Sequence, residues 1–189
     1  MSMHACMGVN TVDGDGTGVL YHVCENNHGH VVRYMVTQHR VDCNVEDKEG
    51  LSPLYISCRY DHTDIVETLV THGADVNVQD INQQTLLWAA AYEGYINSVG
   101  LLLAHRADID LADARQFTPL HTACDQGRDE VVMYLLDRGA NIEALTDDKV
   151  TPLYCAAQEG RTSTLQALMW KGANKECRHK SGATPIIHV

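Results

Sequence analysis

Apolar residues recur along this chain in two short helical patterns that are separated by polar turns. The first pattern is a run such as "FTPLHTAC" at residues 117–124. The second pattern places apolar residues at i, i+1, i+4 and i+5, which lie on one face of a helix. It is found at Val31-Val32-Met35-Val36, Ile65-Val66-Leu69-Val70, Val99-Leu102-Leu103, Val131-Val132-Leu135-Leu136 and Leu165-Leu168-Met169. The pattern predicts pairs of short helices joined by turns.

The central residue of the first pattern returns at a constant interval. It stands at the evenly spaced positions Leu54, Leu87, Leu120, Leu153 and Ile186, and Leu20 lies one position further from Leu54 than this interval predicts. Self-similarity at such a period is typical of repeat arrays. Because one helix pair cannot bury its apolar face alone, neighbouring pairs must stack into an all-α solenoid.

The residues around each helix predict where it begins and ends. A Ser or Thr stands at the N-cap position, in most copies followed by Pro at the first helical position, which suits a helix start. The caps are Ser52, Thr85, Thr118, Thr151 and Thr184, and the prolines are Pro53, Pro119, Pro152 and Pro185. Residues that tolerate the left-handed conformation are expected to end the first helices at Asn27, Asp61, Gly94, Gly127 and Gly160, and the second helices at Gly73, Gly139 and Gly172.

The repeated runs resemble the ankyrin repeat. They read "LSPLYIS", "QTLLWAA", "FTPLHTA", "VTPLYCA" and "ATPIIHV", and most are followed by runs such as "VTHGADVN" and "LDRGANIE". The resemblance implies an ankyrin-repeat α-solenoid with projecting β-turn or hairpin loops. We place a lead-in at 1–12, repeats at 13–46, 47–79, 80–112, 113–145 and 146–178, and a partial sixth at 179–189. Both ends are out of phase with the repeat, so we expect a piece of a longer array.

Several residues depart from the pattern, most of all in the third repeat. Arg106 stands where Gly is expected, and a left-handed conformation there costs about 1 kcal/mol. In the third repeat Leu86 replaces Pro and Trp88 replaces His, so the polar network that ankyrin repeats build around this His is not expected there. Tyr21, Tyr55 and Tyr154 replace the same His in other repeats.

Composition narrows the classes of partner and compartment. The formal charge of −11 opposes contact with nucleic acid or an anionic membrane, so we expect a neutral to basic protein or peptide partner. No apolar stretch approaches the roughly 18 residues that span a bilayer. Seven cysteines without a CxxC pair favour a reduced intracellular, cytoplasmic protein. Three of them occupy a position that is Ala in other repeats, which predicts burial of Cys24, Cys58 and Cys124.

The sequence carries no convincing signal for catalysis or metal binding. The segment from Asp13 to Gly18 is similar to the start of a calcium loop, but its twelfth position is Cys24 rather than Glu. His28, His30 and His62 match no zinc spacing. No phosphate loop or catalytic motif is present. We therefore expect neither an enzyme nor a cofactor.

Binding is expected on the concave face, which in ankyrin-like proteins is made by the projecting turns and the exposed side of the first helices. Carried onto this chain, the resemblance implies Lys48, Glu49, Leu51, Arg59, Tyr60, Ile81, Asn82, Gln84, Tyr92, Glu93, Ala114, Arg115, Phe117, Asp125, Gln126, Asp147, Asp148, Val150, Gln158 and Glu159. Tyr60, Tyr92 and Phe117 are candidate aromatic anchors. The alternative is that these are simply solvated, variable positions.

Two further hypotheses follow from the resemblance. The array is either a binding module by itself, monomeric and with ends that permit end-to-end association, or a substrate-selecting or regulatory segment of a larger enzyme, channel or ubiquitin-ligase adaptor. Asn77 lies in the run "ADVN", in a context similar to that of asparagines hydroxylated in ankyrin repeats, so it is a candidate for hydroxylation.

Overall fold

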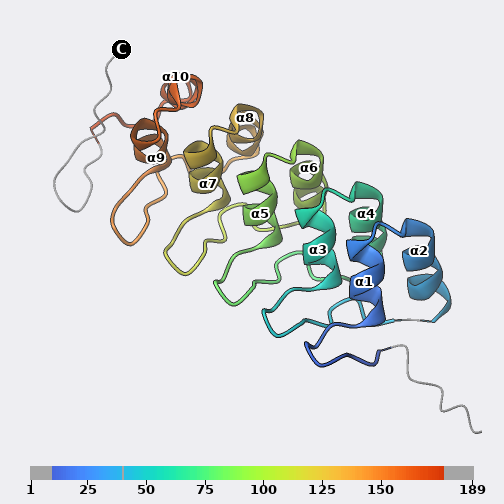
Figure 1. Cartoon of the computed structure of the whole chain (residues 1–189). Coiled ribbons are helices and arrows are strands. Elements are labelled where there is room, and N and C mark those ends of the chain that lie inside the picture. Colours follow the sequence, from blue (N-terminus) through green and yellow to red (C-terminus); the bar gives the residue numbers. More distant parts are fainter. Residues whose placement is uncertain (1–9, 40, 177–189) are drawn as a thin grey trace, which may run out of the picture.

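The computed structural model describes residues 10–39 and 41–176. These residues form ten α-helices in five consecutive pairs (Figure 1). The pairs are α1 (Val19–Glu25) with α2 (Gly29–Gln38), α3 (Pro53–Arg59) with α4 (Thr63–Thr71), α5 (Leu86–Glu93) with α6 (Ile96–Ala104), α7 (Pro119–Gln126) with α8 (Asp129–Asp137), and α9 (Pro152–Gln158) with α10 (Thr162–Trp170). Extended backbone pairing in the described part is limited to two isolated bridges, Val12 with Gly18 and Gln79 with Thr85.

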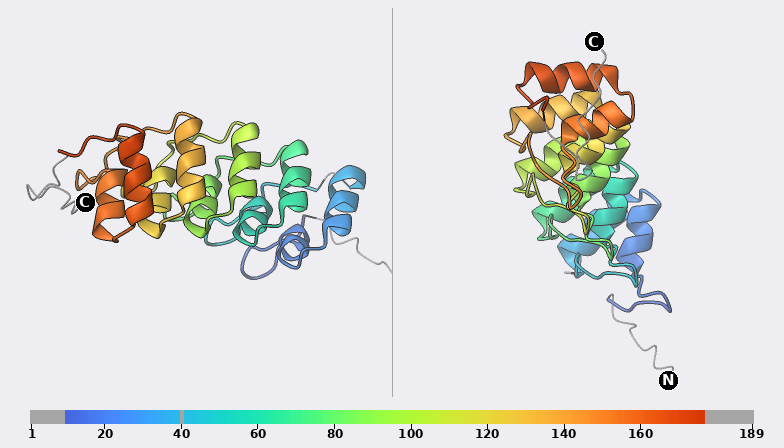
Figure 2. Two further views of the ribbon diagram at one scale, coloured as in Figure 1. Left: turned by 90° about the horizontal axis from the view of Figure 1, so that it is seen from above. Right: turned by 90° about the vertical axis from the view of Figure 1, so that its left-hand side faces the viewer.

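The helices are arranged in two rows (Figure 1 and Figure 2). The first helices α1, α3, α5, α7 and α9 pack on one another in sequence order, and the second helices α2, α4, α6, α8 and α10 form the row behind them. Each first helix also packs on the second helix of its own pair. The periodic leucines Leu54, Leu87, Leu120 and Leu153 lie fully buried in the shared core. The predicted all-α repeat solenoid is therefore confirmed.

Helix starts follow the predicted capping residues. The side-chain oxygens of Ser52, Thr85, Thr118 and Thr151 accept hydrogen bonds from the backbone N–H three residues later, at 3.0 to 3.4 Å. Each hydroxyl satisfies an N–H group that has no partner within its helix. The cap, rather than the apolar pattern, thus fixes the first residue of these helices.

Helix ends also lie at the predicted residues. Asn27 and Asp61 have positive φ, as do Gly94, Gly127 and Gly160, and the glycines after α4, α8 and α10 have φ of 90 to 93°. Arg106 has a φ of 68°, so a side chain with a Cβ atom occupies the left-handed conformation that Gly holds in the neighbouring repeats. The left-handed conformation predicted at Arg106 is present in the structure.

His121 forms the polar network that the third repeat lacks. This buried imidazole accepts the Thr118 N–H at Nδ1 (3.2 Å), and its Nε2 lies 3.0 Å from the Val150 carbonyl oxygen of the next turn. Burial lowers the pKa of His121 to about 4. At the same position, the indole Nε1 of Trp88 is buried without a hydrogen-bond partner among the described residues. The expectation for Trp88 is confirmed.

Burial of the cysteines also agrees with the repeat pattern. Cys24, Cys58 and Cys124 are fully buried, and Cys43 and Cys155 are buried as free thiols as well. Burial raises the pKa of Cys24 and of Cys155 to about 12. The other two cysteines, the cap predicted at Thr184 and the partial sixth repeat lie outside the described residues.

Candidate binding surface

The turns that project from the helices form one continuous row. A backbone N–H of each turn donates to a carbonyl oxygen of the preceding turn, from Lys48 to Asp15 at 3.0 Å, from Ile81 to Glu49 at 3.1 Å, from Ala114 to Asn82 at 3.1 Å, and from Asp147 to Arg115 at 3.3 Å. Figure 1 shows these loops side by side below the first helices. The predicted surface residues of the turns therefore lie on one shared face.

Four aspartates hold the turns in shape. Asp13, Asp47, Asp80 and Asp113 each accept two backbone N–H groups of their own turn at Oδ1, at 2.8 to 3.1 Å. The Thr17 hydroxyl, followed by the backbone N–H of Asp15, holds the pKa of Asp13 at about 2. This role was not predicted. The aspartates recur at the same intervals as the periodic leucines, and this recurrence could have indicated a shared structural role.

Most of the side chains predicted for the concave face reach solvent. Lys48, Glu49, Arg59, Tyr60, Ile81, Asn82, Tyr92, Glu93, Ala114, Arg115, Asp147, Asp148, Gln158 and Glu159 are exposed, and Gln84, Phe117, Asp125 and Gln126 are partly exposed. The expected exposure of Leu51 and Val150 is corrected, because both are buried in the hydrophobic core cluster, although Leu51 also lines a hollow between α3 and α5. Each directly precedes an N-cap residue, where the chain turns from the loop into the core.

The three candidate aromatic anchors differ in their surroundings. Tyr60 and Tyr92 keep 49% and 38% of their surface exposed. Phe117 is half-buried, with its ring centroid 5.4 Å from that of His121 and the Arg115 guanidinium 5.1 Å from its ring. Ile81, at the tip of its turn, is more exposed than any of them at 69%. Tyr60, Ile81 and Tyr92 thus offer the apolar surface that a partner can cover.

A hollow of about 290 Å³ lies between α3 and α5. We call it the α3–α5 hollow and define it by Glu49, Tyr55, Arg59, Asp80, Trp88, Tyr92 and Glu93. The rings of Trp88 and Tyr92 stack in it with centroids 5.6 Å apart and planes only 7° from parallel. The hollow therefore combines stacked aromatic rings with charged side chains.

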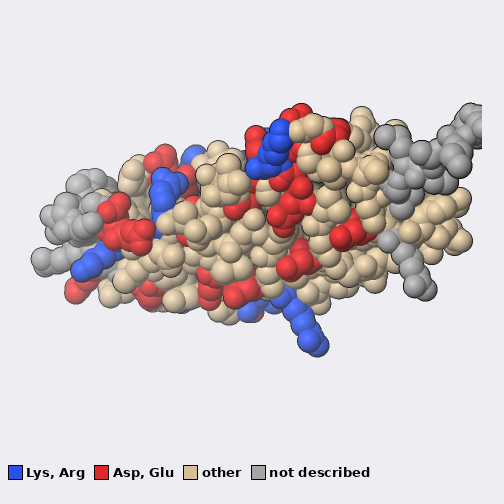
Figure 3. All heavy atoms as spheres, turned by 90° about the horizontal axis from the view of Figure 1, so that it is seen from below, with Lys and Arg blue, Asp and Glu red and all other residues tan. Residues whose placement is uncertain are grey.

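Acidic side chains predominate where the turns project, as the view from below shows (Figure 3). One of the few basic side chains here, Lys48, lies 3.4 Å from the Asp15 carboxylate of the preceding turn. An acidic surface attracts cationic groups over roughly a Debye length, about 8 to 10 Å at physiological salt. The charge of this face therefore attracts cationic groups.

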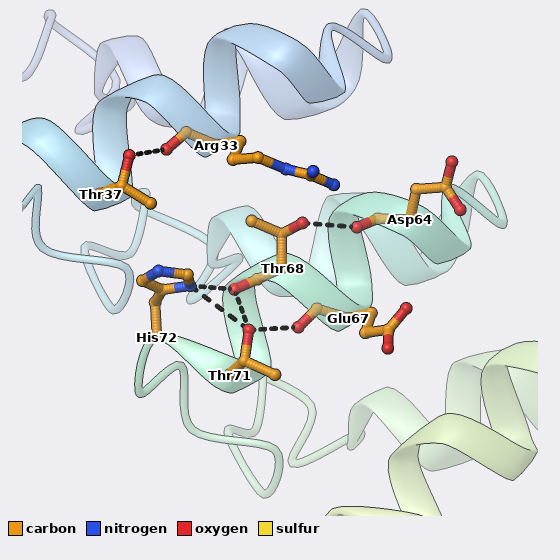
Figure 4. A pocket seen from close by; sticks show the side chains of 7 residues that line it. All are labelled: Arg33, Thr37, Asp64, Glu67, Thr68, Thr71 and His72. Atoms are coloured by element: carbon orange, nitrogen blue, oxygen red, sulfur yellow. Dashed lines mark hydrogen bonds between the residues drawn. The ribbon is translucent and has the colours of Figure 1, made fainter.

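A second hollow, of about 340 Å³, lies between α2 and α4 (Figure 4). Several of its polar side chains bond to their own helices, since Thr37, Thr68 and Thr71 donate to carbonyl oxygens four residues earlier at 2.6 to 2.8 Å. Arg33, Asp64 and Glu67 supply charges of both signs. Nothing in this mixture selects one class of ligand.

Asn77 has a structural role in addition to its candidacy for hydroxylation. Its Oδ1 accepts the backbone N–H of Asp108 at 2.8 Å, one repeat later. Asn44 holds Asp75 in the same way at 2.8 Å, and Asp110 holds Asn141 at 3.0 Å. Asn77 is thus one link in a series of side-chain bonds that join consecutive repeats.

The described residues contain neither a metal site nor a helix that could span a membrane. No group of three or more His, Cys, Asp or Glu side chains there is placed to hold a metal ion. No helix in that part of the chain has the length and apolar character that crossing a membrane requires.

Models of known protein families match nearly the whole chain. A family model described as ankyrin repeats (3 copies) matches residues 3–80 and 78–146, and a second, described as ankyrin repeat, matches residues 148–180. Alpha-latrocrustotoxin-Lt1a of Latrodectus tredecimguttatus is 40% identical over 45 residues, which is 24% of this chain and 3% of the toxin.

Two other relatives are similar over somewhat longer stretches. Alpha-latroinsectotoxin-Lt1a of the same spider is 36% identical over 61 residues, or 32% of this chain and 4% of that protein. A putative ankyrin repeat protein of Acanthamoeba polyphaga mimivirus is 29% identical over 69 residues, or 36% of this chain and 7% of that protein. The matched stretch is a small part of each relative. Since the family models match more than half of the sequence, the chain belongs to the ankyrin repeat family.

Proposed function

We propose that this chain binds a protein or peptide partner on its concave face. Ankyrin repeats are protein-interaction modules, and the turns of the present repeats lie in one continuous row beside the first helices. The observation that carries the proposal is the exposure of Tyr60, Ile81 and Tyr92, which are large apolar side chains that the core does not use. Buried aromatic anchors supply much of the affinity at protein interfaces.

The proposal includes the chemistry and the compartment of the partner. An acidic chain suits a neutral to basic partner rather than nucleic acid or an anionic membrane. Buried, free thiols are compatible with a reducing cytoplasm, which we propose as the compartment. In this proposal the chain acts without a cofactor and without catalysis. The proposal also keeps the repeat boundaries given above.

The test is affinity capture from lysate of the source cells with two matched triple variants. The first, Tyr60→Ala, Ile81→Ala, Tyr92→Ala, removes apolar side chains from the concave face. The second, Tyr34→Ala, Glu130→Ala, Trp170→Ala, changes exposed side chains on the second helices. Circular dichroism establishes that each variant is folded. Partners that the first variant loses and the second retains support the proposal, whereas equal capture by both contradicts it.

The second candidate function is that of a regulatory or substrate-selecting segment within a larger polypeptide. The observation that favours it is that the matched stretch covers only 3 to 7% of each relative described above. Sequencing the transcript beyond both ends of this chain tests it. A neighbouring enzyme, channel or ligase-adaptor domain supports this candidate, and a stop codon directly after Val189 together with the absence of such a domain upstream contradicts it.

A further inference from the structure

The α3–α5 hollow has a floor of aromatic rings. Trp88 and Tyr92 are one helical turn apart on α5, and their rings stack parallel to each other. Tyr55 occupies the position of Trp88 one repeat earlier, and burial raises the pKa of its hydroxyl to about 12, so the ring stays neutral. Aromatic faces of this kind attract cations through their quadrupoles and also pack against aliphatic chains.

The end of the hollow nearest the turns carries only negative charge among its lining residues. Glu49 and Asp80 come from two consecutive turns, which the bond from the Ile81 N–H to the Glu49 carbonyl oxygen holds together at 3.1 Å. The Glu49 carboxylate is exposed and makes no ion pair or hydrogen bond with another described residue. The neighbouring ammonium group of Lys48 lies beside Asp15, in the preceding turn.

The opposite end of the hollow carries both signs of charge. Arg59 and Glu93 are the last residues of α3 and α5, and neither forms an ion pair in the described part of the chain. The charges of Arg59 and Glu93 offset each other, so this end of the hollow gives a cation no net attraction. The carboxylates of Glu49 and Asp80 draw it toward the turns, where Trp88 lies three residues after the Thr85 cap.

We propose that the α3–α5 hollow binds a lysine or arginine side chain of an extended segment of the partner protein. The aliphatic stem lies on the Trp88 and Tyr92 rings, and the cationic head lies between Glu49 and Asp80. This inference rests on the proposed function, because it assigns the chemistry that part of the concave face recognises. It also gives a role to Trp88, which stands where the repeat pattern has a His that would bond to the next turn.

The test observes the indole N–H signal of Trp88 in ¹⁵N–¹H NMR spectra of the whole chain. The chain has two tryptophans, so Trp170→Phe identifies the signal. The probes are capped pentapeptides Gly-Ser-X-Ser-Gly, in which X is Lys, Arg, Nε-acetyl-lysine or Glu. We expect the Lys and Arg peptides to shift the signal, with a dissociation constant of about 1 mM. The acetyl-lysine and Glu peptides should not shift it.

Two variants at matched carboxylates decide whether the hollow causes the response. Glu49→Gln removes a charge from the hollow but leaves the turn intact, because only the backbone of Glu49 is hydrogen-bonded. It should weaken binding of the Lys peptide about two-fold to five-fold. Glu130→Gln, an exposed change on α8, should leave binding unchanged. No response to Lys or Arg, an equal response to acetyl-lysine, or equal affinities for the two variants overturns the inference.

Failure of this inference is distinguishable from failure of the proposed function. If the concave triple variant loses partners that Glu49→Gln still captures at full strength, and the Lys peptide gives no NMR response, the concave face binds by other contacts and only the inference fails. If the triple variant loses no partner, the proposed function itself fails.

Discussion

Arg128, the residue before α8, donates its Nε–H to the carbonyl oxygen of Tyr92 near the end of α5, at a distance of 2.9 Å. Arg161 makes the same bond to the Asp125 carbonyl oxygen one repeat later, also at 2.9 Å. These bonds satisfy carbonyl groups that have no partner within their own helices. They also tie the end of each first helix, including the part that carries Tyr92, to the following repeat.

Replacing Arg128 should loosen this connection. Arg128→Met retains an aliphatic stem but has no N–H to donate, so the free energy of unfolding should fall by about 1 to 2 kcal/mol. Arg161→Met should have a similar effect. The exposed Arg33 of α2 has no such bond, and Arg33→Met serves as the control with little expected change. Urea denaturation measures all three, and an equal loss for Arg33→Met would contradict the explanation.

The bond from the Asp108 N–H to the Asn77 side chain predicts a difference between two substitutions. Asn77→Ala removes the acceptor and should lower stability by about 1 kcal/mol. Asn77→Asp should keep most of the stability, because Asp110 is the acceptor for Asn141 at the equivalent position. Thermal melts monitored by circular dichroism compare the two proteins. A larger loss of stability in Asn77→Asp than in Asn77→Ala would contradict this explanation.

The left-handed conformation of Arg106 predicts a stabilising substitution. Arg106→Gly should raise the free energy of unfolding by about 1 kcal/mol, because Gly has no Cβ atom to be strained at a φ of 68°. The reciprocal change, Gly139→Arg, should lower stability by a similar amount at an exposed position with a φ of 90°. Guanidinium denaturation curves of the two variants should move in opposite directions, and a shift in the same direction would refute the strain at Arg106.

The buried, neutral His121 predicts a loss of stability in mild acid. Its folded pKa of about 4 lies below the ordinary value of 6.5, so between these pH values the unfolded chain binds the proton and the native chain does not. This contribution is fully present above pH 6.5 and falls as the pH approaches 4, by roughly 3 kcal/mol in all.

The pH effect is measured by urea denaturation at a series of pH values. His121→Gln should reduce the slope of stability against pH in this window, although the variant is less stable at neutral pH because the imidazole contacts are lost. His30→Gln, a substitution of the same type at an exposed position, serves as the control variant. An unchanged slope in His121→Gln would show that other groups titrate in the window.

The five described cysteines should react slowly in the folded protein. Cys24, Cys43, Cys58, Cys124 and Cys155 are all buried, and burial raises the pKa of each thiol, so little reactive thiolate is accessible at pH 7.5. Iodoacetamide followed by peptide mapping should find these five unmodified in buffer and modified in 6 M guanidinium. Rapid native labelling of Cys58 would contradict the packing described above.

Local sequence signals predicted much of the fold because each acts over a few residues. Ser52 and Thr118 begin helices through bonds to an N–H three residues away, and Asp61 and Gly127 end helices through their own φ angles. The constant period of the repeats then predicted the stacking, because a short helix pair cannot bury its apolar face alone.

Most of the predicted site residues reach solvent, but the period did not reveal how deeply each side chain lies. Leu51 and Val150 occupy positions that the repeat pattern assigns to the turn, yet their side chains enter the core. Phe117 is an aromatic candidate anchor like Tyr92, but its ring packs on His121 within its own repeat. These differences depend on neighbouring side chains that have no fixed place in a sequence pattern.

The sequence by itself determined the repeat, the helix boundaries, the acidic charge and the burial of Cys24, Cys58 and Cys124, because these depend on residue type and spacing. Only the tertiary structure decided which polar groups meet across repeats, such as Arg128 with Tyr92 and Asn77 with Asp108. Those partners lie 31 to 36 residues apart, and only the stacking of one repeat on the next brings them within hydrogen-bond distance. The α3–α5 hollow has the same origin, since its aromatic floor and its carboxylates come from two repeats.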